Sequence, residues 1–166
     1  MICPVCHFET MAGSDDCENC GADLRTSGLP TSAGGDVGAA LLTEHLSDLA
    51  PRRPVSVGPD DEIAAVVALM QEHGIGCVTV EQDRLIGIVT ERDVVLKLAG
   101  RSLAGIRVRD VMTPDPVVLR GDDTIAVAIH KMATGGFRHI PLVSEGRATG
   151  IVSARDLSHH LVTLIG

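Results

Sequence analysis

Two stretches of the chain carry the same spacing of apolar positions. Apolar side chains recur at positions i, i+3, i+4 and i+7 in both, and the residues are Ile63, Val66, Val67, Met70, Ile125, Ala128, Ile129 and Met132. This spacing places apolar side chains along one face of an α-helix. The sequence therefore predicts two amphipathic helices, around residues 63–70 and 125–132, that each bury one face.

Short apolar runs surround each predicted helix. One run precedes each helix, and two runs joined by a polar turn follow it, as expected for short strands. The runs are residues 55–57, 77–80, 85–89, 117–119, 140–143 and 148–152. A further helix is expected to begin near Asp93 and another near Asp156. The predicted order is therefore β-α-β-β-α, followed by the same order again.

The two patterns are copies of one repeat. The copies align with an offset of 62 until one extra residue enters the second copy near residues 135–139, and the offset is 63 afterwards. Coinciding pairs include Asp48 and Asp110, Met70 and Met132, and Asp93 and Asp156. Such a repeat indicates one supersecondary unit used twice. We predict an α/β (α+β) fold of two repeats, residues 46–108 and 109–166, related by pseudo-twofold symmetry.

Four cysteines lie in the first 25 residues. They form the pairs Cys3-x-x-Cys6 and Cys17-x-x-Cys20, and Gly21 follows the second pair, where a tight turn often requires a positive φ angle. Two such pairs can point four thiolates at one centre, which is a ligand set that Zn²⁺ prefers. In these features residues 1–25 resemble a zinc ribbon. Because the protein would supply all four ligands, the expected role of the zinc is structural.

Three alternatives for the cysteines remain open. Iron fits the same four-sulfur cage, as in rubredoxin. Disulfides would require an oxidising compartment. The run from Cys3 to His7 also fits the pattern of covalent haem attachment, but this chemistry would require export and would leave Cys17 and Cys20 without a role.

A stretch of small polar residues separates the cysteines from the repeats. Residues 26–38 are rich in Gly, Ser and Thr, which is typical of a flexible linker. Residues 39–49 are expected to form a short helix. Linker and helix together account for the interval 26–45 before the first repeat.

Composition narrows the possible functions. The formal net charge is -8, and the chain has two Phe but no Trp or Tyr. It therefore lacks the basic patch and the stacking aromatics of nucleic-acid-binding proteins. Its apolar runs are too short to span a membrane, and no signal-peptide pattern follows Met1. We expect a cytoplasmic protein that binds neither nucleic acid nor membrane.

The repeats resemble the cystathionine β-synthase (CBS) domain family. Gly87–Val94 and Gly150–Leu157 share the order Gly, two aliphatic residues, Thr or Ser, two variable residues and Asp. Arg109–Pro114 looks like the usual entry into a second CBS repeat, and His139–Val143 looks like the family's middle strand. The resemblance covers residues 46–165 and implies a tandem CBS pair, or Bateman module.

The first copy departs from the family pattern in two places. Val78 stands where Pro is usual, and Ala50-Pro51 replaces Met-Thr. Neither change is expected to remove a polar contact to a ligand.

The resemblance also implies two clefts for an adenosine ligand. Asp93 and Asp156 would bind the ribose hydroxyls, because a carboxylate accepts several hydrogen bonds. Thr90 and Ser153 would contact ribose or phosphate, and Arg138 would offer a base to phosphate. Adenine would lie near Val57, Val78 and Ile88 in one cleft and near Leu119, Ile140 and Ile151 in the other. A hydroxyl three residues before a carboxylate also caps a helix, so capping alone remains an alternative.

The implied function is regulatory. A CBS pair of this kind would sense adenine nucleotides of the AMP, ADP or ATP type and signal to a protein partner. The alternative is a protein-interaction or stress-response protein that acts without ligand. We find no catalytic constellation and expect no enzyme. Apolar helix faces follow Asp93 and Asp156, and together with the resemblance they lead us to expect a homodimer. Their residues are Val94, Val95, Leu98, Leu157, Leu161 and Leu164. The alternative is that these faces pack within one chain.

Overall fold

The chain folds into two compact units that each combine segments from both repeats. The computed structural model describes residues 2–3, 5–10, 14–24 and 35–165. One unit consists of Met1–Pro51, Gly121–Ile140 and Val152–Gly166, and the other consists of Arg52–Arg120 and Pro141–Ile151. The mixed α+β class expected from the sequence is confirmed.

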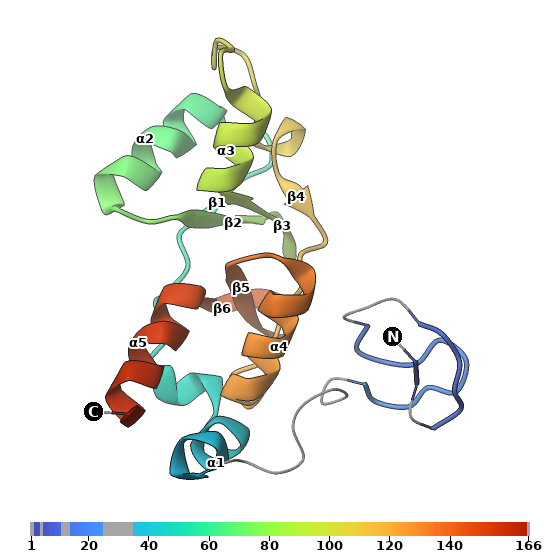
Figure 1. The fold of residues 1–166 in the computed structure, drawn as a ribbon. Helices are drawn as coiled ribbons and strands as arrows, with labels where there is room; N and C mark the ends of the chain where they lie inside the picture. The colour runs from blue at the N-terminus through green and yellow to red at the C-terminus, as the bar shows by residue number, and fades with distance from the viewer. Residues whose placement is uncertain (1, 4, 11–13, 25–34, 166) are drawn as a thin grey trace. The chain divides into compact units, whose positions relative to one another are not determined.

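The unit that contains residues 52–120 is built on a four-stranded sheet. Its strands are β1 (Ser56–Val57), β2 (Cys77–Glu81), β3 (Leu85–Thr90) and β4 (Thr113–Pro114), in that order, with β1 and β2 parallel and the other neighbours antiparallel. The helices α2 (Ile63–His73) and α3 (Glu91–Leu98) cover one face of this sheet (Figure 1). The order β-α-β-β-α is therefore present in the first repeat, and the second repeat adds β4.

The predicted apolar face of α2 forms the centre of this unit's core. Ile63, Val66 and Met70 are buried, whereas Val67 is half-buried. They join Val78, Val80, Val89, Leu98, Val108 and Val111. Burying an aliphatic side chain of this size contributes about 1.5–3 kcal/mol. The core therefore fixes which face of β2 and β3 points towards the helices.

The other unit is mainly helical. The helices α1 (Gly35–Thr43), α4 (Ile125–Gly135) and α5 (Ala154–Ile165) contact one another. In the second repeat, β5 (His139–Ser144) and β6 (Arg147–Ser153) pair with each other, and their residues Pro141–Ile151 belong to the unit that contains residues 52–120. The strand predicted at residues 117–119 is reduced to a single parallel bridge between Leu119 and Leu142.

The short helix predicted at residues 39–49 is present as two pieces. The helix α1 ends at Thr43, and the 3-10 turn η1 (Leu46–Leu49) follows. Between them the backbone turns away to pair with the entry to α4, where the Glu44 carbonyl accepts a hydrogen bond from Ile125 N at 3.1 Å. The helix α1 begins at Gly35, so residues 35–38 of the predicted linker are helical, and residues 26–34 lie outside the described part of the chain.

The segment that leads into each repeat bonds to the other repeat. Ile125 N donates to Glu44 O, and at the pseudo-equivalent position Ile63 N donates to Ile106 O at 2.9 Å. The pairs Leu46–Asp123 and Val108–Asp61 are linked in the same way, at 2.9 and 3.0 Å between N and O. The bonds of Glu44 and Leu46 join Met1–Pro51 to Gly121–Ile140 in one unit, and the bonds of Ile63 and Val108 lie within the stretch Arg52–Arg120 of the other.

Within the described residues, no helix combines the length and the apolar composition needed to cross a membrane.

Candidate functional site

The four cysteines lie on two knuckles with the same backbone conformation. In the first, His7 N donates to Cys3 O at 3.0 Å and Cys3 N donates to Phe8 O at 2.9 Å. In the second, the same two bonds join Gly21 to Cys17 and Cys17 to Ala22, both at 2.8 Å. Each knuckle is closed by an antiparallel bridge, Ile2–Glu9 or Asp16–Asp23. The ribbon is thus itself a repeat with an offset of 14, which the sequence analysis missed.

The residue after each cysteine pair adopts a left-handed conformation. Gly21 has a φ of 68°, as the sequence predicted, and His7 has a φ of 58° at the corresponding position of the first knuckle. Non-glycine residues in this region cost conformational energy, so the knuckle geometry overrides local preference at His7. This turn allows both cysteines of a pair to point to the same side.

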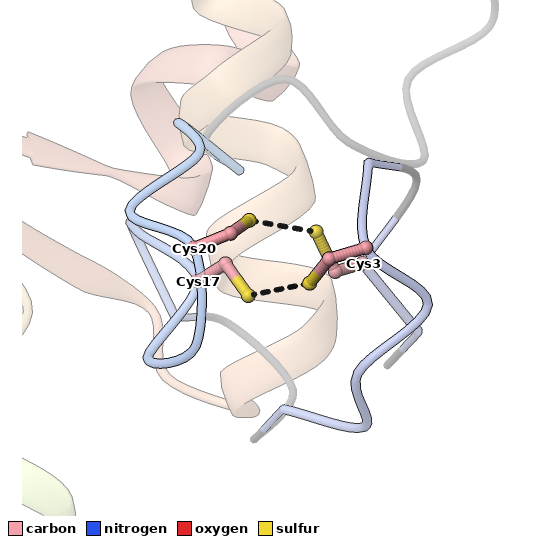
Figure 2. A group of neighbouring side chains, drawn as sticks. Cys3, Cys17 and Cys20 are labelled. Atoms are coloured by element: carbon pink, nitrogen blue, oxygen red, sulfur yellow. Dashed lines mark hydrogen bonds between the residues drawn. The ribbon is translucent and has the colours of Figure 1, made fainter.

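The sulfur atoms converge on one point. All four Sγ atoms lie within 4.8 Å of one another, with Cys3 and Cys20 at 3.8 Å and Cys6 and Cys17 at 3.5 Å. Figure 2 shows Cys3, Cys17 and Cys20 pointing towards a common centre. Tetrahedral zinc with Zn–S bonds near 2.3 Å requires sulfur–sulfur distances of roughly 3.8 Å. The distances are far longer than a disulfide bond, and all four cysteines are free thiols.

Neighbouring groups act on two of the thiols. A hydrogen bond from Asn19 and then the backbone at Phe8 lower the pKa of Cys6 to about 6. At Cys20 the backbone at Ala22 lowers the pKa, but the hydrogen bond to Cys6 together with burial outweighs it and raises the pKa to about 12. Metal ions bind thiolates, so metal uptake must displace the remaining thiol protons. The residues present therefore fit a structural tetrahedral metal.

The predicted ligand residues of the first repeat form a compact box at the junction of β3 and α3. Thr90 N and Thr90 Oγ1 donate to Asp93 Oδ2 at 3.0 and 2.6 Å, and Asp93 N donates back to Thr90 Oγ1 at 3.2 Å. This is an N-terminal capping box. The capping alternative is therefore realised in the structure, whether or not a ligand binds.

The second repeat has the same box at the junction of β6 and α5. Ser153 N and Ser153 Oγ donate to Asp156 Oδ2 at 2.8 and 2.6 Å, and Asp156 N donates to Ser153 Oγ at 3.3 Å. Both predicted pairs are thus brought together, and their inner hydrogen bonds are equivalent.

The outer oxygen of Asp93 has partners that the sequence analysis missed. Thr113 Oγ1 on β4 donates to Asp93 Oδ1 at 3.0 Å, and Lys97 Nζ lies 2.8 Å from the same oxygen. Lys97 follows Asp93 by four residues on α3, a spacing that could have revealed the ion pair. Thr113 reaches Asp93 only because β4 pairs with β3, which local sequence does not specify.

Arg138 lies beside the second box through its backbone. Its carbonyl accepts a hydrogen bond from Ala154 N, the first residue of α5, at 2.9 Å, and its side chain is exposed. Gly76 occupies the equivalent place in the first repeat and accepts from Glu91 N at 3.0 Å. Arg138 and Gly76 therefore occupy matching positions in the two repeats, and only the second repeat has a side chain there.

The residues expected to line adenine in the first repeat lie in different surroundings. Val78 is fully buried and belongs to the core beneath the helices, whereas Ile88 lies outside that core cluster. On β2, Thr79 is buried and its hydroxyl lies 2.9 Å from Ser56 Oγ. Strand side chains alternate between faces, so Val78 points away from the face that Thr79 occupies. Val78 therefore belongs to the core on the helix side of β2, and its contact with adenine stays a prediction.

These repeats define a tandem CBS-domain protein. Residues 46–100 and 108–163 each match the CBS domain family, and together they cover more than half of the chain. The chain belongs to this family, whose paired domains form regulatory modules. The resemblance inferred from the sequence is confirmed for the CBS pair.

Similar proteins include curated relatives and solved structures. An uncharacterized 17.7 kDa protein of Acidianus ambivalens is 36% identical over 124 residues, which are 73% of this chain and 75% of the relative. An inosine-5'-monophosphate dehydrogenase of Korarchaeum cryptofilum is 37% identical, but the match covers 73% of this chain and only 25% of the enzyme.

Two solved structures have similar folds. A CBS-domain protein of Agrobacterium tumefaciens is 33% identical and has a TM-score of 0.64, with 70% of this chain and 98% of that chain covered. A CBS domain pair solved in complex with 5-methylthioadenosine and S-adenosyl-L-methionine is 21% identical and has a TM-score of 0.65, with 74% and 100% covered. At that identity, the second likeness shows the fold alone.

Proposed function

We propose that this CBS pair senses an adenosine-containing nucleotide, of the AMP, ADP or ATP type, and signals to a protein partner without catalysing a reaction. The observation that carries the proposal is the duplicated box at the strand–helix junctions, Thr90 with Asp93 and Ser153 with Asp156. In each box a hydroxyl and a carboxylate stand beside the first amides of a helix, where sugar hydroxyls and phosphate find complementary partners.

The charge around the second box favours a phosphorylated ligand. Arg138, whose backbone lies at the N-terminus of α5, has an exposed side chain, and the helix end contributes a further positive potential. The choice of adenosine over other nucleosides follows the resemblance to the CBS family, in which one pair of related fold is solved with two adenosine compounds.

A structural zinc in the ribbon is the second part of the proposal. Cys3, Cys6, Cys17 and Cys20 would bind the ion, and the closed sulfur set leaves no position for substrate. The two knuckles share a small buried cluster of Cys3, Cys17 and Leu24, too small to hold a segment of this length together without a metal. Zinc would therefore supply folding free energy, not chemistry.

A calorimetric screen tests the proposal. The purified chain is titrated with AMP, ADP, ATP and S-adenosylmethionine, and we expect saturable heat with at least one of them. GMP and GTP serve as matched controls with the same sugar and phosphates. If no adenosine compound gives heat, the sensor function is wrong, and turnover of any of these compounds would contradict the non-catalytic role.

A ligand-independent interaction module is the second candidate. Asp93 favours it, because Lys97 and Thr113 already satisfy the outer oxygen of this carboxylate. In that case the boxes would serve only as helix caps, and the screen would give no heat.

A further inference from the structure

We propose that the two repeats are unequal as ligand sites because Lys97 occupies the ribose acceptor of the first, so that each chain binds one nucleotide, at Asp156. This inference rests on the proposed function and specifies which of the two boxes performs it.

The carboxylate of Asp93 has no acceptor position left for a sugar. Its Oδ2 accepts from Thr90 N and Thr90 Oγ1 at 3.0 and 2.6 Å. Its Oδ1 accepts from Thr113 Oγ1 at 3.0 Å and faces Lys97 Nζ at 2.8 Å. Because each carboxylate oxygen accepts about two hydrogen bonds, both oxygens are saturated. A ribose would have to displace Lys97 or Thr113 to bind.

Lys97 is held in place by more than the ion pair. Its ammonium donates to the Val111 carbonyl at 2.6 Å and lies 3.4 Å from the Met112 carbonyl, in addition to Asp93 Oδ1. Three acceptors thus match the three ammonium hydrogens. These carbonyls immediately precede β4, whose pairing with β3 also places Thr113 against Asp93. Lys97 therefore belongs to the structure of this sheet edge and does not act as a mobile surface charge.

Within the described residues, only one carboxylate oxygen of Asp156 accepts hydrogen bonds. Its Oδ2 makes the same inner bonds to Ser153, but no group of the described residues hydrogen-bonds to its Oδ1. The residue four positions later is His160, which pairs with Glu44 at 2.6 Å between Nε2 and Oε2 and leaves Asp156 alone. The counterpart of Thr113 in the repeat register is Pro51, which has no hydroxyl. Asp156 Oδ1 therefore remains available to accept from a vicinal diol.

A second difference favours the same box. The backbone of Arg138 lies beside α5 and its side chain is exposed, whereas Gly76 at the matching position offers no side chain. The open acceptor and the phosphate base thus lie in the same repeat. A nucleotide with both ribose and phosphate finds both partners only there.

The test is a calorimetric titration of the full chain with AMP that measures stoichiometry. Wild type should bind one AMP per chain, and Asp156→Asn should weaken this binding by about tenfold or more, well beyond any effect of Asp93→Asn. Lys97→Met removes the cation from Asp93 and should add a second, weaker site. Lys97→Arg is the matched control, because it keeps the cation and should leave the stoichiometry at one.

The possible outcomes separate the inference from the proposed function. Two equal sites in wild type, or a greater loss with Asp93→Asn than with Asp156→Asn, would overturn the inference and leave nucleotide binding intact. Absence of AMP, ADP and ATP binding in wild type would overturn both. If Lys97→Met fails to fold, as judged by its thermal transition, the comparison of Asp93→Asn with Asp156→Asn decides.

Discussion

At Asp93, burial and hydrogen bonding act on the carboxyl group in opposite directions. Burial raises its pKa, but the bonds from Lys97, Thr90 and Thr113 outweigh burial and hold the pKa below the ordinary value of 3.8. A group with a lowered pKa stabilises the fold above its ordinary pKa, and this stability is lost as the pH falls through the folded value. The bonds to Asp93 therefore contribute fully at neutral pH and fail only in acid.

Replacement of Asp93 by Asn tests how much the Asp93 carboxylate contributes to stability. We expect Asp93→Asn to lower the free energy of unfolding at pH 7 by about 1 kcal/mol, because it removes a capping carboxylate and an ion pair. The difference from wild type should shrink as the pH falls below 3.8 and through the lower pKa of the folded state, where the wild-type carboxyl becomes protonated in both states. Urea unfolding of both proteins at pH 7 and below pH 3.8 measures the difference. A difference that stays constant with pH would show that charge at Asp93 does not contribute.

Gly87 lies on β3 opposite Pro114 of β4. A Cβ atom there would lie 2.7 Å from Met112 Sδ and 3.1 Å from the Thr113 carbonyl, and backbone cannot easily move. We expect Gly87→Ala to destabilise the fold by about 1–3 kcal/mol in denaturant unfolding. Gly121→Ala is the matched control, because its nearest neighbour would be Ser47 at 3.7 Å. Equal stability of the two variants would contradict the close packing of β4 on β3.

Among the elements, the two knuckles depend on one another through the metal they would share. Cys17→Ser should reduce zinc from one ion per chain to none and unfold the ribbon, since only a small buried cluster otherwise joins the knuckles. The CBS repeats should stay folded. Elemental analysis and amide NMR spectra measure the two effects.

Cys77 provides the control for this experiment. It is buried on β2, outside the cluster, so Cys77→Ala should leave the metal content unchanged. Wild-type protein that contains neither zinc nor iron when purified without chelator would contradict the metal site.

The sequence predicts elements well where local periodicity determines them. The spacing of Ile63, Val66 and Met70 predicted α2 and its buried face, and the repeat located the helix in the second copy. The apolar run at 117–119 did not become a strand, because only Leu119 pairs with a neighbour. Whether an apolar run becomes a strand depends on its pairing with a distant segment, and the run alone does not specify that pairing.

In the candidate site, too, local contacts were predictable from the sequence and long-range contacts were not. Both hydroxyl–carboxylate pairs span three residues along the chain, so their meeting was predictable. The saturation of Asp93 was not, because Thr113 reaches it across the β3–β4 pairing and the Lys97 ammonium is held by carbonyls next to β4. A contact made by strand pairing between repeats carries no local signal.

For the whole molecule, exposed apolar side chains favour a homodimer. Val95 and Leu96 on α3 are 63% and 70% exposed, and Val162 and Ile165 on α5 are 68% and 73% exposed. Such side chains on CBS helices favour association between copies. We expect light scattering to give twice the chain mass of 17.4 kDa, and Val95→Glu with Val162→Glu to shift the mass towards that of one chain. A monomeric wild type at high protein concentration would contradict this expectation.

The central claim is that an adenosine nucleotide binds the folded CBS pair, and a thermal melt with and without ligand tests it most directly. Ligand at about 100 times its dissociation constant should stabilise the fold by about 2.7 kcal/mol, which is a rise of several degrees in melting temperature. AMP, ADP or ATP should produce this rise, and their guanosine counterparts should not. If every adenosine compound leaves the melting temperature unchanged at millimolar concentration, the sensor account is contradicted.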